Sequence, residues 1–354
     1  MNPRGENTYR EIVHQPEAWS QAVEVARSQA ESLRDLWQRA GAGPLLFIGC
    51  GSTYYLSQAA AAMAREAGLR ADAMPASELW LSPRLAGDLA GTLLVAVSRS
   101  GETSETVHAV QTFRQAGGRA VLHVGCYPES LLARSSDLAL TVPRAQEVSV
   151  AQTRSFASMF ILCRALVAGL VDGPGAIAQL APLPDLGRRL LERYAGLAES
   201  LGTHSSLQRF FFLGSGPRYG LACEAMLKMK EMSLSYSEAY HPLEFRHGPK
   251  SVVNTESLVV GLLTDEARAQ ETAVLSDMKE LGARTLAVAE GGSPKEMGGA
   301  DYAIDLGSGL SMADRLVLYL PVLQLMAYHR ALANGQDPDR PRNLTAVVTL
   351  PEGR

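Results

Sequence analysis

Short apolar runs alternate with longer amphipathic stretches along most of the chain. Runs of four to six apolar residues that end at glycine or serine are typical of buried strands. Regular alternation of strands and helices with short loops predicts an α/β fold, in which a parallel sheet is covered by helices on both faces. The predicted strands are 44–48, 93–97, 120–124, 138–142, 210–213, 258–263 and 285–289, and the predicted helices are 53–66, 103–115, 267–281 and 312–333.

The same pattern occurs twice. Gly49-Cys-Gly51 follows the first strand, and Gly214-Ser-Gly216 follows its counterpart in the second half. Residues 93–124 and 258–289 both read strand, helix, strand with similar lengths. We therefore expect an internal duplication of one doubly wound unit. The predicted domains are 1–185, 186–338 and a polar C-terminal tail at 339–354.

Composition narrows the classes of function. The 354 residues suffice for two domains, and a net charge of −4 gives no basic surplus for binding nucleic acid. The apolar stretch 316–326 is too short or too interrupted to span a bilayer, so we expect no membrane partner. The N-terminus is polar and shows no export signal.

The four cysteines are scattered, without a CxxC motif and without histidines at metal-ligand spacing. Such cysteines are typical of reduced, mostly buried thiols in a cytoplasmic protein. No metal and no cofactor are predicted.

Hydroxyl side chains gather where two predicted strands of the first half end. Ser52 and Thr53 follow one strand, and Ser98, Ser100 and Thr103 follow another. Ligands of parallel sheets bind at the carboxyl ends of strands, where glycine turns, backbone N–H groups and hydroxyls converge on an anion. One hydroxyl suffices to cap a helix, so three around a glycine favour a phosphate site over simple capping.

The second half carries different chemistry. The segment that matches 98–103 begins Thr264-Asp-Glu266, whose carboxylates would repel phosphate. Its first helix instead places Glu224, Lys228 and Glu231 at i, i+4 and i+7, on one face. A solvated charge ladder is the simpler interpretation, but the apolar residues around these three predict a buried helix, and buried charges persist when they are paired or used. We expect one half to bind phosphate and the other to supply acid–base groups.

A dinucleotide site is an alternative interpretation, because Gly49-x-Gly51 follows a strand and Asp72 lies about 20 residues further on. Tyr54 occupies the third glycine position and is too bulky for close packing of helix on strand. The hydroxyls at 98–103 also have no role in such a site.

Seven segments, taken in order, resemble the sugar isomerase (SIS) family, and in particular synthases of amino-sugar phosphates. The resemblance covers more than 300 residues and implies two tandem, doubly wound, flavodoxin-like SIS domains. The segments are 9–16, Cys50–Thr53, Ser98–Thr103, Glu147–Phe156, Phe212–Gly216 with Glu224–Glu231, Glu238–Tyr240 with Glu244–Pro249, and Asp339–Leu344.

The resemblance implies a role for individual residues. Glu231 matches the carboxylate that moves a proton between C1 and C2, Lys228 the lysine beside it, and His247 the histidine that assists ring opening. In that family the histidine comes from a second subunit, which implies a homodimer. The residues implied to hold or line the sugar-phosphate pocket are Ser52, Thr53, Ser98, Arg99, Ser100, Thr103, Val150 and Gln152.

Three departures from the family pattern change the expected chemistry. Ala346 stands where the family has the lysine that aids ring opening and forms a Schiff base. Gln152 replaces a serine and Arg154 a lysine. The chain also shows no glutaminase domain, so we do not expect it to make glucosamine 6-phosphate from glutamine alone.

These observations predict an isomerase or deaminase of a hexose 6-phosphate, such as glucosamine 6-phosphate or fructose 6-phosphate, that works by enediol-type proton transfer. Two alternatives stay open. A sensor that binds the sugar phosphate without catalysis would need only the phosphate loops, and Ala346 favours it. A deglycase of ketoamine 6-phosphates would act on a substrate whose amine is already in place.

Overall fold

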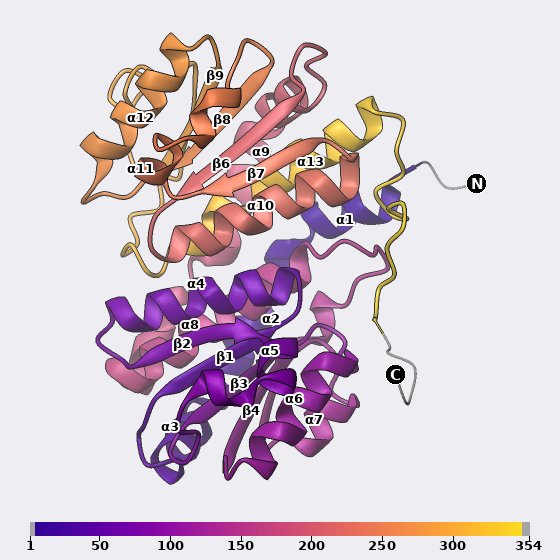
Figure 1. The fold of residues 1–354 in the computed structure, drawn as a ribbon, viewed down its shortest axis with the longest axis vertical. Coiled ribbons are helices and arrows are strands. Elements are labelled where there is room, and N and C mark those ends of the chain that lie inside the picture. The colour runs from indigo at the N-terminus through magenta and orange to yellow at the C-terminus, as the bar shows by residue number, and fades with distance from the viewer. Residues whose placement is uncertain (1–3, 349–354) are drawn as a thin grey trace. The chain divides into compact units, whose positions relative to one another are not determined.

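The computed structural model describes residues 4–348, so the end of the predicted tail lies outside the described residues. The chain forms two compact units that interleave in sequence (Figure 1). The first unit comprises His14–Glu147, Gln152–Pro184 and the chain from Thr345 onward. The second unit comprises the chain up to Val13, Val148–Ala151 and Asp185–Leu344.

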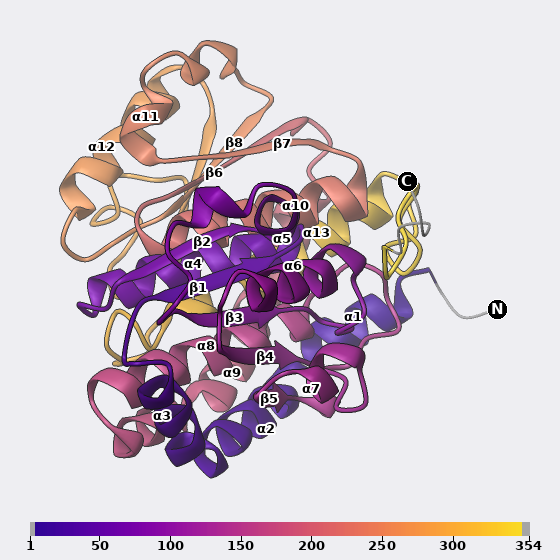
Figure 2. The same cartoon turned by 60° about the horizontal axis from the view of Figure 1, so that its bottom comes forward.

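The first unit contains a five-stranded parallel sheet in the order β2-β1-β3-β4-β5. Its central strands β1, β3 and β4 are completely buried, as expected for strands covered on both faces. Strand order reverses between β1 and β3, which lie side by side (Figure 2). The strands are β1 (Leu45–Gly49), β2 (Ala71–Pro75), β3 (Leu93–Val97), β4 (Ala120–Gly125) and β5 (Leu138–Thr141).

Helices cover both faces of this sheet. Apolar residues of α5, α6 and α7 pack on one face in a single buried cluster that includes Ile48, Leu94, Phe113 and Val121. Helices α4 and α8 contact each other and the sheet. The helices are α2 (Gln15–Ser28), α3 (Ala30–Arg39), α4 (Ser52–Glu66), α5 (Ala76–Leu81), α6 (Ser104–Gln115), α7 (Leu131–Ser135) and α8 (Arg154–Val171), with short 3-10 turns at Pro83–Ala86, Pro143–Ala145 and Pro174–Leu180.

The second unit repeats the arrangement. Its sheet has the order β7-β6-β8-β9-β10 and is again entirely parallel, so both sheets follow the flavodoxin-like order 2-1-3-4-5. The predicted duplication of a doubly wound α/β fold is thereby confirmed. The strands are β6 (Arg209–Gly214), β7 (Tyr236–Tyr240), β8 (Ser257–Leu262), β9 (Arg284–Ala289) and β10 (Tyr302–Asp305).

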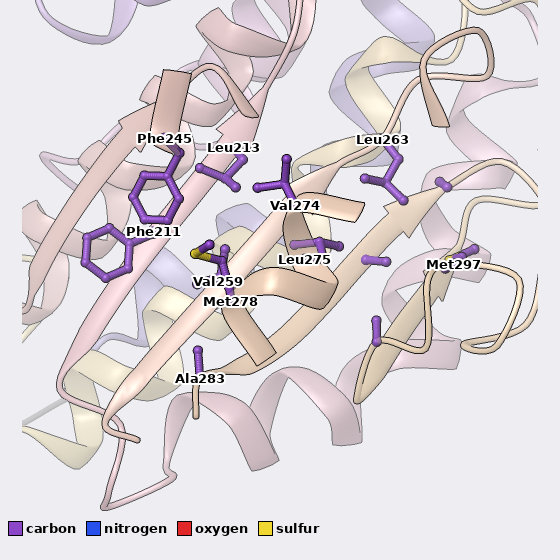
Figure 3. Packing of buried hydrophobic residues seen from close by; sticks show 13 residues of the cluster. Phe211, Leu213, Phe245, Val259, Leu263, Val274, Leu275, Met278, Ala283 and Met297 are labelled. Atoms are coloured by element: carbon purple, nitrogen blue, oxygen red, sulfur yellow. The ribbon is translucent and has the colours of Figure 1, made fainter. Parts of the chain in front are cut away.

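The core of the second unit has α12 on one face of its sheet. Figure 3 shows Val274, Leu275 and Met278 of this helix packed toward Phe211 and Val259 of the strands. On the other side, α10 contacts β6, β7 and α13. The helices are α1 (Glu6–Val13), α9 (Leu183–Gly202), α10 (Pro217–Ser233), α11 (Pro242–Phe245), α12 (Arg268–Glu280) and α13 (Pro321–Ala333), with 3-10 turns at Pro249–Val252 and Leu316–Tyr319.

The prediction of one helix over 312–333 is wrong at its N-terminal end. Residues Leu316–Tyr319 form a 3-10 turn, and the α-helix begins only at Pro321. Proline has no N–H to donate and its ring clashes with the preceding turn, so it starts a helix rather than continuing one.

The start of the chain and the tail meet within the second unit. The Asp339 carboxylate accepts hydrogen bonds from the backbone N–H groups of Asn7 and Thr8, at 3.1 and 2.7 Å, and from the Thr8 hydroxyl. These N–H groups lie in the first turn of α1, which has no partners for them within the helix. The tail motif therefore caps α1.

Two stretches, Arg154–Val171 and Leu316–Ala333, are long and apolar enough to cross a membrane by length and composition alone. In each, 83% of the stretch is buried inside the fold. Core helices of globular proteins share these properties, so the finding is weak evidence for a membrane span.

Candidate active site

The hydroxyl loops of the first unit lie where its strand order reverses. Strands β1 and β3 are paired neighbours in register, with Ile48 opposite Ala96, so the loops that follow them emerge side by side. In doubly wound sheets the crevice between such loops is the usual ligand site. The structure therefore brings the two predicted phosphate loops to one edge of one sheet.

Residues 98–103, called the phosphate loop below, form a tight turn. The hydroxyls of Ser98 and Ser100 accept hydrogen bonds within this turn. Ser98 Oγ accepts from the N–H of Gly101 at 3.1 Å, and Ser100 Oγ accepts from the N–H of Glu102 at 3.2 Å. Each hydroxyl acts as acceptor in these bonds, so its own O–H can be donated to an anion. Among the described residues, no side-chain hydrogen bond caps α6, although Thr103 occupies its N-cap position. Simple capping thus does not explain these hydroxyls.

Thr53 is engaged differently. Its Oγ1 accepts from the Cys50 N–H at 2.9 Å and lies 3.0 Å from the Cys50 carbonyl, to which its O–H donates. The hydroxyl therefore closes the turn after β1, and its proton is committed to that turn. Ser52, the first residue of α4, is also buried. Cys50 is half-buried, and burial raises the pKa of its thiol to about 11.

Arg99 joins the phosphate loop to two other segments of the first unit. Its Nη1 lies 3.3 Å from a carboxylate oxygen of Glu147, and its Nη2 donates to the Ala346 carbonyl at 3.0 Å. The side chain of Glu147 is fully buried, and its carboxylate also accepts hydrogen bonds from the backbone and side chain of Thr153 and from Ser155. Position 346, which carries no amine, thus lies at the phosphate loop.

Two predicted pocket residues come from the segment after Glu147. Val150 lies in Val148–Ala151, which belongs to the second unit and is held there by the buried carboxylate of Glu11, which accepts from the Val148 N–H at 2.6 Å and from Ser149. Gln152 returns to the first unit and is half-buried. The sequence patterns assign no role to Glu11 or Glu147, and the signal for both is an acidic residue within a family-like segment.

The predicted acid–base helix is α10 of the second unit. Glu224 is fully buried, Lys228 has 1% of its side chain exposed and Glu231 has 20%. The Lys228 ammonium lies 3.3 Å from Glu224 and 2.5 Å from Glu231. The structure therefore brings these three groups together in the interior, as predicted, and leaves only Glu231 partly accessible.

The charge state of Lys228 follows from these contacts. Burial alone would lower the pKa of its ammonium, but the two carboxylates outweigh burial and hold the pKa above its ordinary value. Lys228 is therefore a fixed cation beside Glu231. A protonated amine cannot attack a carbonyl, but it can stabilise negative charge that develops on a nearby oxygen.

His247 lies in the turn between α11 and the 3-10 turn at Pro249–Val252. Its backbone N–H donates to the Glu244 carbonyl at 2.9 Å. Its side chain is exposed. Across residues 4–348, no group of three or more His, Cys, Asp or Glu side chains is placed to hold a metal ion.

The SIS domain family model matches residues 40–169 and 205–329. The chain belongs to the SIS domain family. Each matched segment contains one of the two parallel sheets, so the chain carries two SIS domains, one per unit.

Relatives add detail to this assignment. Glutamine–fructose-6-phosphate aminotransferase (isomerizing) of Aeropyrum pernix is 32% identical over 96% of this chain, which spans 57% of that protein's length. The structure of tagatose-6-phosphate ketose/aldose isomerase from Escherichia coli matches with a TM-score of 0.86 and 25% identity, over 99% of this chain and 98% of that one. Glucosamine-6-phosphate deaminase from Thermotoga maritima matches with a TM-score of 0.78 and 26% identity, over 98% and 100%.

Proposed function

We propose that this SIS protein is an isomerase or deaminase that moves a proton between C1 and C2 of a hexose 6-phosphate. The observation that carries the proposal is the buried cluster of Glu224, Lys228 and Glu231, in which one carboxylate keeps partial access to solvent. Burying three ionised groups costs several kcal/mol before pairing, so their retention favours use over mere packing. Two relatives of similar structure are named for an isomerisation and a deamination of such sugars.

The phosphate loop binds the 6-phosphate mainly through neutral donors. The hydroxyls of Ser98 and Ser100, which accept hydrogen bonds within the loop, donate their own O–H groups to the phosphate. The Arg99 guanidinium lies in the same loop, but Glu147 balances its charge and the tail carbonyl takes one of its donors. We therefore assign Arg99 to holding the loop and tail together, with its influence on phosphate being indirect.

Proton transfer is assigned to Glu231. His247, contributed by a second copy of the chain in a homodimer, moves the proton that opens the sugar ring. The Glu231 carboxylate then removes the proton from the carbon next to the carbonyl or imine, and the electron pair forms an enediol or enolamine. Glu231 returns the proton to the adjacent carbon. The Lys228 ammonium stabilises the negative charge that develops on oxygen.

The same step serves two net reactions. With an aldose or ketose 6-phosphate, transfer between C1 and C2 interconverts the two sugars. With glucosamine 6-phosphate, transfer from C2 to C1 produces an imine at C2. Water adds to this imine, ammonia leaves, and fructose 6-phosphate remains.

The distribution of lysines favours a second candidate, a ketoamine 6-phosphate deglycase. The chain has five lysines, at 228, 230, 250, 279 and 295, and none in the first unit, where Ala346 lies. Lys228 is held as a cation, and Lys279 is paired with Asp301 at 2.8 Å. A ketoamine already carries nitrogen on C1, so it needs no lysine: proton transfer from C1 to C2 gives a C1 imine, water adds, and the amine leaves.

One set of assays separates these activities. The purified chain is incubated in deuterated buffer with fructose 6-phosphate, glucosamine 6-phosphate or a fructosamine 6-phosphate, and NMR follows deuterium uptake at C1 and C2 while a coupled assay follows released ammonia or amine. We expect exchange with at least one of these substrates and a loss of about 10³-fold in Glu231→Gln. The control is Glu266→Gln, which removes an exposed carboxylate of the second unit. Binding without exchange, unchanged by Glu231→Gln, would instead identify a sensor.

A further inference from the structure

Strand β4 carries a buried histidine that the proposed chemistry does not use. His123 is fully buried, and its Nδ1 lies 3.1 Å from the carbonyl oxygen of Ala96 on the neighbouring strand β3. A carbonyl only accepts hydrogen bonds, so Nδ1 carries the proton and Nε2 presents a lone pair. Burial lowers the pKa of His123 to about 4, so the ring is neutral at physiological pH.

The Nε2 edge of this ring lies directly against the phosphate loop. A Cβ atom added to Gly125 would stand 2.5 Å from Nε2 and 2.6 Å from the Ser98 carbonyl oxygen. A Cβ atom added to Gly101 would stand 3.3 Å from Nε2 and 2.1 Å from Ser130 Oγ. The loop and the ring are therefore so close that only glycine fits between them. Within residues 4–348, Nε2 has no hydrogen-bond partner.

The backbone of the loop is attached to the segment that follows His123. The Ser98 N–H donates to the Val124 carbonyl at 3.0 Å, and the Cys126 N–H donates to the Arg99 carbonyl at 3.1 Å. The Leu132 N–H donates to the Gly101 carbonyl, also at 3.1 Å. These bonds attach the loop backbone to the end of β4 and to α7, and the imidazole of His123 lies against Gly101 between these attachment points.

We propose that His123 is a positioning residue for phosphate binding. Its Nδ1–H fixes the ring on Ala96, and its Nε2 edge sets the height of the Ser98–Gly101 turn. Through that height it sets where the hydroxyls of Ser98 and Ser100 point. The inference rests on the proposed assignment of this loop to the substrate phosphate.

Two substitutions test the Nδ1 and Nε2 sides of the imidazole separately. His123→Asn keeps an amide donor near the Nδ1 position but ends short of the loop, whereas His123→Gln fills the Nε2 position and gives up the bond to Ala96. We expect His123→Asn to weaken binding of fructose 6-phosphate and of inorganic phosphate about tenfold, because small displacements of binding groups are costly, and His123→Gln to stay within about threefold of the wild type. Isothermal titration calorimetry measures both ligands, and thermal melting reports the fold.

The matched control is Val121→Ala. Val121 lies two residues before His123, so it faces the same side of β4, in the buried cluster with α5, α6 and α7. Its truncation leaves a cavity and should lower the melting temperature without changing phosphate affinity. A loss of affinity equal to that of His123→Asn would show that any damage to this face has the same effect, and would overturn the proposal.

Gly125→Ala tests the contact from the other side and serves if His123→Asn does not fold. The added methyl group meets both Nε2 and the Ser98 carbonyl, so it should raise the loop and weaken phosphate binding. Affinity at the wild-type level in Gly125→Ala, or in a folded His123→Asn, overturns the positioning role alone. A wild-type chain that binds neither fructose 6-phosphate nor phosphate overturns the phosphate assignment as well, so the two failures are distinguishable.

Discussion

The two SIS domains share one backbone design and differ in what stands at the ends of their strands. In each domain a glycine stands directly before the helix that follows the first strand, and the two glycines have nearly the same conformation. Gly51 has φ 55° and ψ −123°, and Gly216 has φ 55° and ψ −130°. Gly49 and Gly214 are equally alike, because a Cβ on either would lie within 2.5 Å of a carbonyl group of the following helix. The duplication therefore kept the turn geometry in both halves.

The loop at 98–103, after β3, and its counterpart from Thr264, after β8, carry different side chains. In the first unit the loop carries hydroxyls that can donate to an anion. In the second unit the Thr264 N–H and hydroxyl are satisfied by the buried Glu271, and Asp265 pairs with Arg268 and Arg315. The second unit thus fills this loop with internal hydrogen bonds and ion pairs, and the residues for which we propose acid–base chemistry lie on α10 instead. Equivalent backbone positions do not make equivalent sites; the side chains decide.

The largest effect is expected from Lys228→Met. Removing the ammonium leaves the buried carboxylate of Glu224 and the partly exposed carboxylate of Glu231 without their shared cation, which should lower the free energy of unfolding by about 3–5 kcal/mol. Chemical denaturation measures this. Lys230→Met, which removes an exposed ammonium two residues later, should change it by less than about 0.5 kcal/mol. Similar losses in both would show that the α10 cluster is only a surface ladder.

The next effect tests whether the hydroxyls of the phosphate loop bind the substrate phosphate. Ser100→Ala/Thr103→Ala should weaken binding of fructose 6-phosphate about 10- to 100-fold, because each lost donor is worth about 1 kcal/mol or more against a charged ligand. Ser135→Ala removes an exposed hydroxyl of the same unit and should leave affinity unchanged. Normal affinity in the double variant would remove phosphate binding from this loop, and with it the contrast between the domains.

We expect His123 to make the free energy of unfolding of the first unit sensitive to acid. The pKa of this histidine is about 4 in the folded state, against an ordinary value of 6.5, so only the unfolded chain takes up the proton between those pH values. Its contribution to stability is complete above pH 6.5 and is lost as pH falls toward 4, by about 2 kcal/mol at pH 5. Denaturation of wild type and His123→Asn at pH 8 and pH 5 measures the difference; identical pH slopes would contradict it.

The smallest effect is expected in the loop after β8 of the second unit, where Asp265 forms ion pairs. Asp265→Asn removes the carboxylate that pairs with the nearly buried Arg315, while Glu290 stays 3.9 Å away. We expect a loss of about 1 kcal/mol in the free energy of unfolding and no change in phosphate affinity. A gain of phosphate binding in this variant would reveal a second anion site, and the two strand-end crevices would then differ only by one carboxylate.

The buried strands could be predicted because they are apolar throughout. The prediction for β3 agrees with the structure at both ends, and those for β1, β4, β5, β6, β8 and β9 agree within one residue at each end. The missed strands, Ala71–Pro75, Tyr236–Tyr240 and Tyr302–Asp305, are three of the four strands at sheet edges. Edge strands are half-exposed and tolerate polar residues and proline, so their pattern does not stand out from loops.

The duplicated α/β fold, the hydroxyl-rich loop at 98–103 and the spacing of Glu224, Lys228 and Glu231 could all be read from the amino-acid sequence, because each depends on local periodicity or on residues close in the chain. How these groups are held in place became visible only in the folded chain. It showed that Thr53 closes its own turn, that Arg99 binds Glu147 and the tail carbonyl of Ala346, and that His123 lies against the phosphate loop. Apart from the Thr53 turn, these contacts join residues tens to hundreds of positions apart, and no local pattern encodes which of them will meet.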